Sequence, residues 1–416
     1  MDPQPEKLVP EQVFTPRTLV TRKMFERRNE PDSDGNPGVQ DRLVDAIRDR
    51  GGQVLMYGDT GVGKSSLLKY VAEDLELKLV TIECTANTDY AGMLDDVVRK
   101  LLDVRETKFT KRRNFEAGVS AEGSVPWFTK LSGTVKGAVG RDTEYQVIEK
   151  PAVDVVTELL SKSGISLLVL DNFQNVRTES TRELVAQLLE RFSDRASDDW
   201  NEPDAKCVVI GISEDATSLL GSSRSYLRRT AQIGVPRMPD DEIRALLARG
   251  FELLGMEVPD GIMKDFVFYS DGFPYFAHLI GLNVARAALR SGDEAVGRAQ
   301  LMAALTEAAR SVTASYQDRV RLAKERNGDV RPRTQIMKLL ANDSRRSWTG
   351  SEIQDLWVSN IGGRDNFAAI HVALGNLVTE QYGTILKRTG KQGSYRYRFA
   401  DPHIRPFLRI TETDET

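Results

Sequence analysis

The chain of 416 residues has little cysteine and little histidine: it contains Cys84, Cys207 and three histidines, His278, His371 and His403. The two cysteines lie far apart in apolar segments, which excludes a disulfide framework and a cysteine pair with metal-ligand spacing. The histidines show no paired spacing, so we expect neither zinc chemistry nor a nucleophile–histidine catalytic arrangement. Low cysteine usage fits a reducing compartment, and we expect a cytoplasmic protein.

Long hydrophobic runs are also missing. No segment approaches the roughly 18 apolar residues of a membrane helix, and the start, MDPQPEKLVP, has no apolar centre. We therefore expect no membrane segment and no secretory signal. Lys+Arg 57 against Asp+Glu 61 gives a net charge of -4, so binding to a polyanion by bulk charge is excluded. At roughly 100 to 200 residues per domain, the length predicts two to four domains.

The composition changes along the chain. Residues 1–38 hold six prolines and a polar tract, which predicts an extended N-terminal arm. In residues 39–236, amphipathic helical patterns alternate with short apolar runs, namely QVLMY, LKLVTIEC, ISLLVLDN and AKCVVIGI. This alternation predicts an α/β domain in which helices cover both faces of a parallel sheet.

Three further regions depart from that alternation. Residues 105–150 are rich in Gly, Ser and Lys and predict an insertion in the α/β domain, either a hairpin or a mobile loop. Residues 237–328 have helical periodicity alone and predict an all-α domain. Residues 329–416 show three helical patterns and then two β-like runs, GTILKRT and SYRYRFAD. That succession is typical of a winged helix-turn-helix domain.

One motif carries specific chemistry. Residues 58–65 read GDTGVGKS, which matches GxxxxGK[ST], and they stand between a predicted strand and a predicted helix. Glycines let backbone N–H groups surround phosphates, the lysine reaches the outer phosphates and the serine ligates Mg²⁺. We therefore expect ATP and Mg²⁺ to be bound here, by Gly58, Asp59, Thr60, Gly61, Val62, Gly63, Lys64, Ser65 and Ser66.

A second element is expected to hold the metal. Asp171 ends the apolar run ISLLVLD, where its carboxylate can face Ser65 across the phosphate site. The alternative is an Asp that only caps the next turn. Asn172 follows, where hydrolytic relatives carry a second acid. An amide can orient water but cannot take its proton, so we expect slow or partner-dependent hydrolysis.

With these features and their order, the chain resembles the AAA+ ATPases over about residues 20 to 410. The resemblance is to the branch with the archaeal and eukaryotic replication initiators, the transposition ATPases and the STAND signalling ATPases of bacteria. It implies an ATPase domain, a helical lid over residues 237–328 and a C-terminal winged helix.

The resemblance also implies roles for single residues. Arg28 would contact adenine, although the glycine that usually precedes such an arginine is replaced here by Arg27. Ser213 would be the polar sensor at the end of the fourth strand, or else a helix N-cap. Arg228 or Arg229 would complete the site of a neighbouring subunit, or else form a solvated basic turn.

The lid motif SDGFPY contains Pro274 and resembles the GxP of STAND proteins. It implies that a proline-fixed turn packs against the nucleotide base, with Tyr275 or His278 nearby. The alternative is a capped helix start with His278 in the core.

Charge is distributed unevenly. Residues 331–410 hold 13 basic and 6 acidic residues, a net charge of +7 in a chain with a total of -4. Such asymmetry indicates a surface for phosphates. The expected DNA contacts are in the terminal hairpin, at Lys387, Arg388, Lys391, Arg396 and Arg398. The third helix of this domain, FAAIHVALGNLVTEQY, is nearly uncharged and is poorly suited to read bases. A regulatory or protein-binding role for the domain therefore remains open.

Taken together, these features predict an ATPase whose ATP-bound state forms homo-oligomers and acts as a switch on DNA or a DNA-associated complex. The alternative is a signalling or defence ATPase whose C-terminal domain binds an effector protein. A third hypothesis is a nucleotide-binding protein with negligible hydrolysis.

Overall fold

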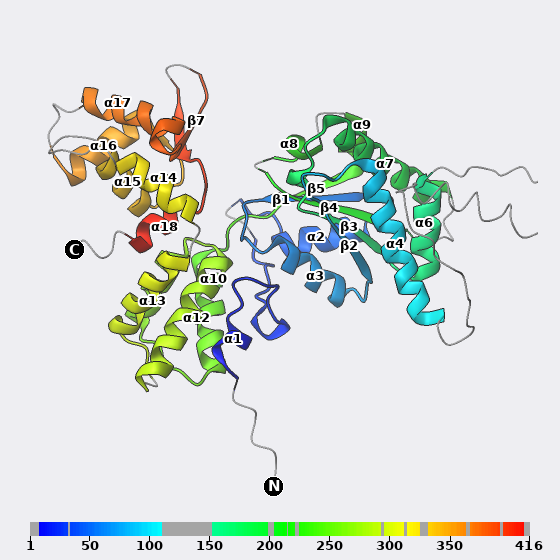
Figure 1. Cartoon of the computed structure of the whole chain (residues 1–416), viewed down its shortest axis with the longest axis horizontal. Helices are drawn as coiled ribbons and strands as arrows, with labels where there is room; N and C mark the ends of the chain where they lie inside the picture. Colours follow the sequence, from blue (N-terminus) through cyan, green and yellow to red (C-terminus); the bar gives the residue numbers. More distant parts are fainter. Residues whose placement is uncertain are drawn as a thin grey trace, which may run out of the picture. The chain divides into compact units, whose positions relative to one another are not determined.

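The computed structural model describes residues 8–31, 34–109, 152–198, 204–213, 215–220, 224–292, 295–311, 314–324, 332–362, 367–391 and 394–411. The chain forms two compact units. We call Arg27–Pro236 the ATPase unit, and Met1–Glu26 together with Arg237–Thr416 the helical unit. Figure 1 shows the elements of both.

The ATPase unit is built on a parallel sheet of five strands in the order β2-β3-β4-β1-β5. The strands are β1 Gln53–Gly58, β2 Leu79–Glu83, β3 Leu167–Asp171, β4 Lys206–Ile212 and β5 Thr230–Gly234. The first four coincide with the four predicted apolar runs, whereas β5 was not among those runs. In this order β2 is an edge strand, and β3 is its neighbour in the sheet.

Helices cover both faces of this sheet, as predicted. One face presents Leu55, Leu170 and Val209 to a core shared with α4 (Tyr90–Phe109), α6 (Ala152–Ser163) and α7 (Glu179–Asp198). The other face is covered by α2 (Val39–Arg48) and α3 (Lys64–Asp74), as Figure 1 shows. Successive side chains of a strand point to opposite faces, so strands enclosed on both sides need continuous apolar runs.

Short elements complete the unit: η3 (Phe173–Asn175) follows β3, α8 (Thr217–Leu220) follows β4, and α9 (Arg224–Arg229) leads directly into β5. Helix α4 continues to Phe109, so the first residues of the predicted insertion are helical. The rest of that insertion lies outside the described residues.

The helical unit begins with α10 Asp240–Leu253, α11 Asp260–Ser270, α12 Pro274–Ser291 and α13 Arg298–Ser311. Then follow α14 Ala314–Lys324, α15 Pro332–Asn342, β6 Trp348–Thr349, α16 Gly350–Asn360, α17 Phe367–Leu377, η5 Glu380–Tyr382, β7 Leu386–Thr389, β8 Arg396–Phe399 and α18 Ile404–Thr411. The three strands form an antiparallel sheet in the order β6-β8-β7. The succession of helices and hairpin agrees with that predicted for a lid followed by a winged helix.

The N-terminal segment differs from the predicted extended arm. It contains α1 Pro10–Val13 and η1 Arg22–Met24 and packs into the helical unit. Phe14 is 1% exposed, and its ring centroid lies 5.2 Å from that of Phe251. Gly281 of α12 makes room for it, because a Cβ at Gly281 would lie 2.6 Å from the Phe14 ring. The division of the chain therefore falls after Glu26 and not at residue 38.

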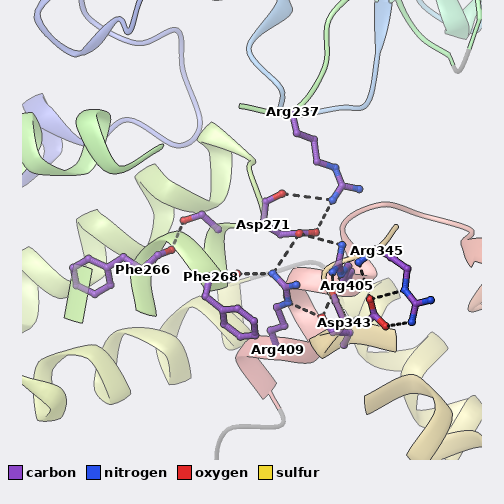
Figure 2. A network of polar contacts seen from close by, with 10 residues as sticks. Arg237, Phe266, Phe268, Asp271, Asp343, Arg345, Arg405 and Arg409 are labelled. Carbon is purple, nitrogen blue, oxygen red and sulfur yellow. Dashed lines mark hydrogen bonds and ion pairs between the residues drawn. The ribbon is translucent and has the colours of Figure 1, made fainter. Parts of the chain in front are cut away.

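A group of charges lies where the turn between α11 and α12 meets α15 and α18 (Figure 2). We call Asp271, Arg237, Arg405 and Arg409 the Asp271 cluster. The Asp271 carboxylate lies 2.5 Å from Arg237 Nη1, 3.4 Å from Arg405 Nη1 and 3.3 Å from Arg409 Nη1. Arg405 and Arg409 also donate to the backbone carbonyl of Ala341, so α15, α18 and the α11–α12 turn are joined.

Burial acts on the charges of this cluster. Arg405 is 2% exposed, and desolvation lowers its pKa to about 10, although the Asp271 carboxylate opposes the shift. The Arg409 guanidinium lies 4.1 Å from the centre of the Phe268 ring, and its pKa is lowered by the same cause. One carboxylate thus serves the two buried guanidiniums of Arg405 and Arg409 and the half-buried guanidinium of Arg237.

Candidate nucleotide-binding site

The phosphate loop runs from the end of β1 to the start of α3, as predicted. Gly58, Gly61 and Gly63 have φ values of 146°, 74° and 91°, a region that side-chain-bearing residues rarely adopt. A Cβ at Gly58 would lie 2.4 Å from the carbonyl oxygen of Val235. The glycines are therefore required by the backbone, and the loop delivers its N–H groups to the N-terminus of α3.

Lys64 is the first residue of α3 and is 9% exposed. Its Nζ donates to the carbonyl oxygens of Gly58 and Asp59, at 3.0 and 2.7 Å. Burial lowers the Lys64 pKa to about 8, while the charges of Asp171 and Asp59 oppose that shift. A desolvated ammonium group held against the loop is suited to bind the outer phosphates of a nucleotide.

Ser65 and Asp171 meet as predicted. The Ser65 hydroxyl, at the start of α3, donates to Asp171 Oδ2 at the end of β3, at 2.9 Å. Mg²⁺ prefers oxygen ligands and is commonly held by one or two carboxylates together with substrate phosphates. One hydroxyl and one carboxylate fit that pattern. In the part of the chain that the structure describes, no group of three or more His, Cys, Asp or Glu side chains could hold a metal.

Asn172 continues the polar contacts away from Asp171. It adopts the left-handed conformation at φ 57° and ψ 34°, and its backbone N–H donates to Asp171 Oδ1 at 2.7 Å. Its side-chain Nδ2 donates to Glu83 Oε2 at 2.8 Å. We call Ser65, Asp171, Asn172 and Glu83 the strand-end chain, because continuous hydrogen bonds run through these four residues.

Sequence reasoning missed Glu83. It ends β2, and the strand pairing places it directly opposite Asp171. A usable signal was present, because Glu83 ends the apolar run LKLVTIE as Asp171 ends ISLLVLD. Which strands are neighbours could not be read from either run alone. Cys84 lies beside them, and burial, together with the charges of Asp171 and Glu83, raises its pKa to about 12.

Ser213 follows β4, and its hydroxyl is engaged locally. It donates to the Asp215 carbonyl at 2.7 Å and accepts from the Asp215 N–H at 3.3 Å. The capping of α8 belongs to Asp215, whose carboxylate accepts from Ser218 N at 2.8 Å. A hydrogen bond from the Thr217 side chain and one from the Ser218 backbone lower the pKa of Asp215. A sensor role for Ser213 stays a prediction.

The two proposed arginine fingers differ in their surroundings. Both end α9 immediately before β5. Arg229 Nη2 lies 2.7 Å from Asp194 Oδ1 of α7, whereas Arg228 is exposed. Of the two, Arg228 is better placed to meet another molecule.

Arg28 lies at the phosphate loop but faces its backbone. It is 4% exposed, and it donates to the carbonyl oxygens of Val62 at 3.4 Å and Pro236 at 2.9 Å. Contact with adenine stays a prediction, whereas these bonds give Arg28 a structural role in the loop.

The proposed lid residues belong to the helical unit. Pro274 is the first residue of α12. Tyr275 stacks on His403, with ring centroids 5.9 Å apart. His278 is buried, accepts from Thr15 N at 3.1 Å and has its pKa lowered to about 4 by burial. His278 is therefore a neutral core residue, and nucleotide contact by Pro274 stays a prediction.

The terminal hairpin forms as predicted, and it sorts the basic residues onto two faces. Lys387 pairs with Arg398, and Thr389 pairs with Arg396. Opposed residues and residues two apart share a face, so Lys387, Arg396 and Arg398 lie on one side. Arg388 lies on the other, 4.3 Å from the centre of the Tyr395 ring. Lys391 is exposed in the loop.

The fold and the phosphate site define the protein as a P-loop ATPase. More narrowly, residues 39–198 match the family model described as the AAA ATPase domain. The chain thus carries an AAA ATPase domain, which confirms the resemblance to AAA+ ATPases. A search of the curated proteins gives no significant match.

One of the solved structures similar to this chain has a TM-score above 0.5 and supports the fold. The chain is similar to a Walker-type ATPase of Pyrococcus abyssi, with a TM-score of 0.52, 18% identity and coverage of 95% of this chain and 99% of that one. It is also similar to Cdc6p from Pyrobaculum aerophilum, with a TM-score of 0.47, 13% identity and coverage of 97% and 98%. For the RuvB Holliday junction branch migration motor of Thermotoga maritima, the TM-score is 0.44 and the identity 12%, with coverage of 94% and 99%.

Within the described residues, none of the helices combines the length and the apolar character that spanning a bilayer requires.

Proposed function

We propose that this protein is a slowly hydrolysing, ATP-dependent oligomeric switch that acts on DNA or on a DNA-associated complex. The observation that supports it most directly is that one chain combines the Ser65–Asp171 pair at a phosphate loop with a basic hairpin face. The first feature binds nucleotide, and the second suits a polyanion.

Each residue of the phosphate site has a distinct task in this proposal. Loop N–H groups and Lys64 bind the phosphates, and Ser65 and Asp171 hold Mg²⁺, which neutralises phosphate charge when bound. Asn172 replaces an acid, so proton removal from water is the weak point and turnover is slow. A turnover above roughly 10 per second for the isolated protein would contradict slow hydrolysis.

Self-assembly is proposed from the position of Arg228. It is exposed at the end of α9, and an arginine from a neighbouring copy is the usual means to stabilise charge on a transferred phosphoryl group. ATP binding would then favour the oligomer, and hydrolysis would release it.

Assembly is tested by light scattering of the full chain with and without ATP and Mg²⁺. We expect ATP to raise the mean mass of the unsubstituted chain, Lys64→Ala to abolish the increase, and Arg228→Ala to reduce turnover while ATP binding persists. Unchanged oligomers with and without ATP would remove the switch from the proposal.

The basic hairpin face supports DNA as the partner. Phosphate contacts by lysine and arginine release counterions, so log K falls with log salt by about 0.9 per phosphate neutralised. Replacing Lys387, Arg396 and Arg398 by alanine should weaken duplex binding at least about tenfold and reduce the salt slope by about 2 to 3. Fluorescence anisotropy with a labelled duplex measures both.

The matched control removes the same charge elsewhere in the helical unit. Arg290, Arg298 and Arg310 are exposed on α12 and α13, and their replacement by alanine should leave duplex binding almost unchanged. If the hairpin variant keeps full affinity, or if both triple variants lose it equally, the hairpin is not the DNA surface.

A second candidate function is favoured by α17, the third helix of the C-terminal domain. Val372 is 63% exposed and Phe367 is 37% exposed on this helix, and apolar side chains cannot make the hydrogen bonds to base edges that carry most direct readout. They suit a protein partner, which would make the chain a signalling or defence ATPase that binds an effector. This function would be favoured if the chain bound a protein partner strongly and independently of salt, and did not bind duplex. The substitution Val372→Ser should then weaken the binding of that partner.

A further inference from the structure

Glu83 is a second carboxylate at the phosphate site, where Asn172 stands in the place expected for an acid. It ends β2 directly opposite Asp171, and its side chain is exposed at the same edge of the sheet. Asn172 Nδ2 donates to its Oε2 at 2.8 Å. A carboxylate is therefore fixed beside the proposed metal ligand, although it comes from the neighbouring strand.

The reaction needs a group in this position. Water that attacks a phosphoryl group must lose a proton, and a carboxylate can accept it whereas the Asn172 amide cannot. Asn172 instead donates two hydrogen bonds. Its backbone N–H donates to Asp171, and its side-chain amide donates to Glu83. The amide thus sets the distance between the metal-holding carboxylate and the second carboxylate.

We propose that Glu83 is the general base of ATP hydrolysis in this protein, and that Asn172 positions it. The water oxygen attacks the γ-phosphorus, and a proton of that water passes to a Glu83 carboxylate oxygen. The bond between the γ-phosphorus and the β,γ-bridging oxygen breaks, so ADP leaves and inorganic phosphate forms. Glu83 then releases its proton to phosphate or to solvent. This inference deepens the slow hydrolysis proposed above and rests on it.

Slow turnover is consistent with this arrangement. Glu83 Oε2 already accepts a hydrogen bond from Asn172 Nδ2, so this oxygen has a partner before the attacking water arrives. The base must give up or share that bond as it receives the proton. The strand-end chain therefore supplies a base and restrains it at the same time.

The test uses the full chain with single-turnover ATP hydrolysis and, separately, calorimetric binding of ATP with Mg²⁺. Glu83→Gln keeps the shape and the contact with Asn172 but cannot accept a proton. We expect it to slow hydrolysis by about 10² to 10⁴-fold, the usual contribution of a general base, and to keep the ATP Kd within about twofold.

Two further variants separate catalysis from structure. Glu73→Gln, the control, removes an exposed carboxylate at the other end of α3 and should leave both measurements unchanged. The double variant Glu83→Asn, Asn172→Glu exchanges the two side chains across the strands. It should hydrolyse ATP at least about tenfold faster than Glu83→Gln, because a carboxylate is again present beside Asp171.

Each result decides the question. Normal hydrolysis in Glu83→Gln, or a loss of ATP binding as large as the loss of rate, would overturn the proposal, since Glu83 would then be dispensable or merely structural. A double variant as slow as Glu83→Gln would also count against it. Absent hydrolysis in the unsubstituted chain would overturn the role of Glu83, while ATP-dependent assembly, measured by scattering, would stand or fall separately.

Discussion

The strand-end chain and the Asp271 cluster are both networks of charged side chains, but they are built for opposite conditions. In the first, Glu83 and Asn172 are exposed at strand ends, where a ligand and water can reach them. In the second, Asp271 is 6% exposed and Arg405 2%, and the partners come from segments far apart in the sequence. The comparison teaches that the exposed network leaves its polar groups open to a ligand, whereas the buried cluster joins elements that lie far apart in the sequence.

The largest effect should come from breaking the buried network. Asp271→Ala leaves Arg237, Arg405 and Arg409 without their shared carboxylate, and an uncompensated buried charge costs about 3 to 5 kcal/mol. Urea unfolding of the helical unit measures this, while ATP affinity should change less than about twofold. A loss below about 1 kcal/mol would show that the cluster does not hold the unit together.

An intermediate effect is expected where the N-terminal segment packs. Gly281→Ala brings a Cβ to 2.6 Å from the Phe14 ring, and such overpacking typically costs about 1 to 3 kcal/mol. Gly261→Ala in α11, where no atom lies within 4 Å of the added Cβ, is the control and should stabilise slightly. Thermal unfolding distinguishes them, and equal stabilities would mean that Phe14 is not held in the core.

The smallest effect concerns Lys64, the residue before Ser65 of the strand-end chain, and is a dependence of ATP affinity on pH. In the free protein the Lys64 pKa is lowered to about 8, so the ammonium form is lost as pH rises through 8. If phosphate binds the charged form, binding takes up a proton above pH 8 and the ATP association constant falls by up to about tenfold per pH unit.

Calorimetry from pH 7 to 9.5 measures the Lys64 effect. Lys64→Arg is the control, since an arginine keeps its charge over this range and should flatten whatever pH dependence lysine causes. An ATP affinity that stays constant to pH 9.5 in the unsubstituted chain would mean that the Lys64 charge is not required.

Local patterns predicted the ATPase unit well. The strands that carry Gly58 and Asp171 are continuous apolar runs with a turn signal behind them, and both features lie within a few residues of sequence. The phosphate loop, its contact with Asp171 through Ser65 and the basic hairpin were likewise readable, because each depends on local spacing or on a known succession of elements.

What the sequence did not reveal depends on pairing at long range. Glu83 became visible as a partner of Asn172 only once β2 was placed beside β3. Phe14 in the core and Asp271 beside Arg405 and Arg409 need contacts across more than a hundred residues of chain, for which a single sequence carries no periodic signal. The division of the two units after Glu26 is of the same kind, since prolines predicted an arm over residues 1–38 and the contact of Phe14 with Phe251 joins residues far apart in the sequence.

Arg28 connects separate segments of the ATPase unit by hydrogen bonds. Its guanidinium reaches Val62 in the phosphate loop and Pro236, the last residue of the unit, while Arg28 itself is the second residue of that unit. The chain crosses between the two units at these two ends. The Arg28 side chain therefore bonds to Val62 of the loop and to Pro236. If Arg28, the loop or Pro236 is displaced relative to the other two, one of these hydrogen bonds is strained or broken.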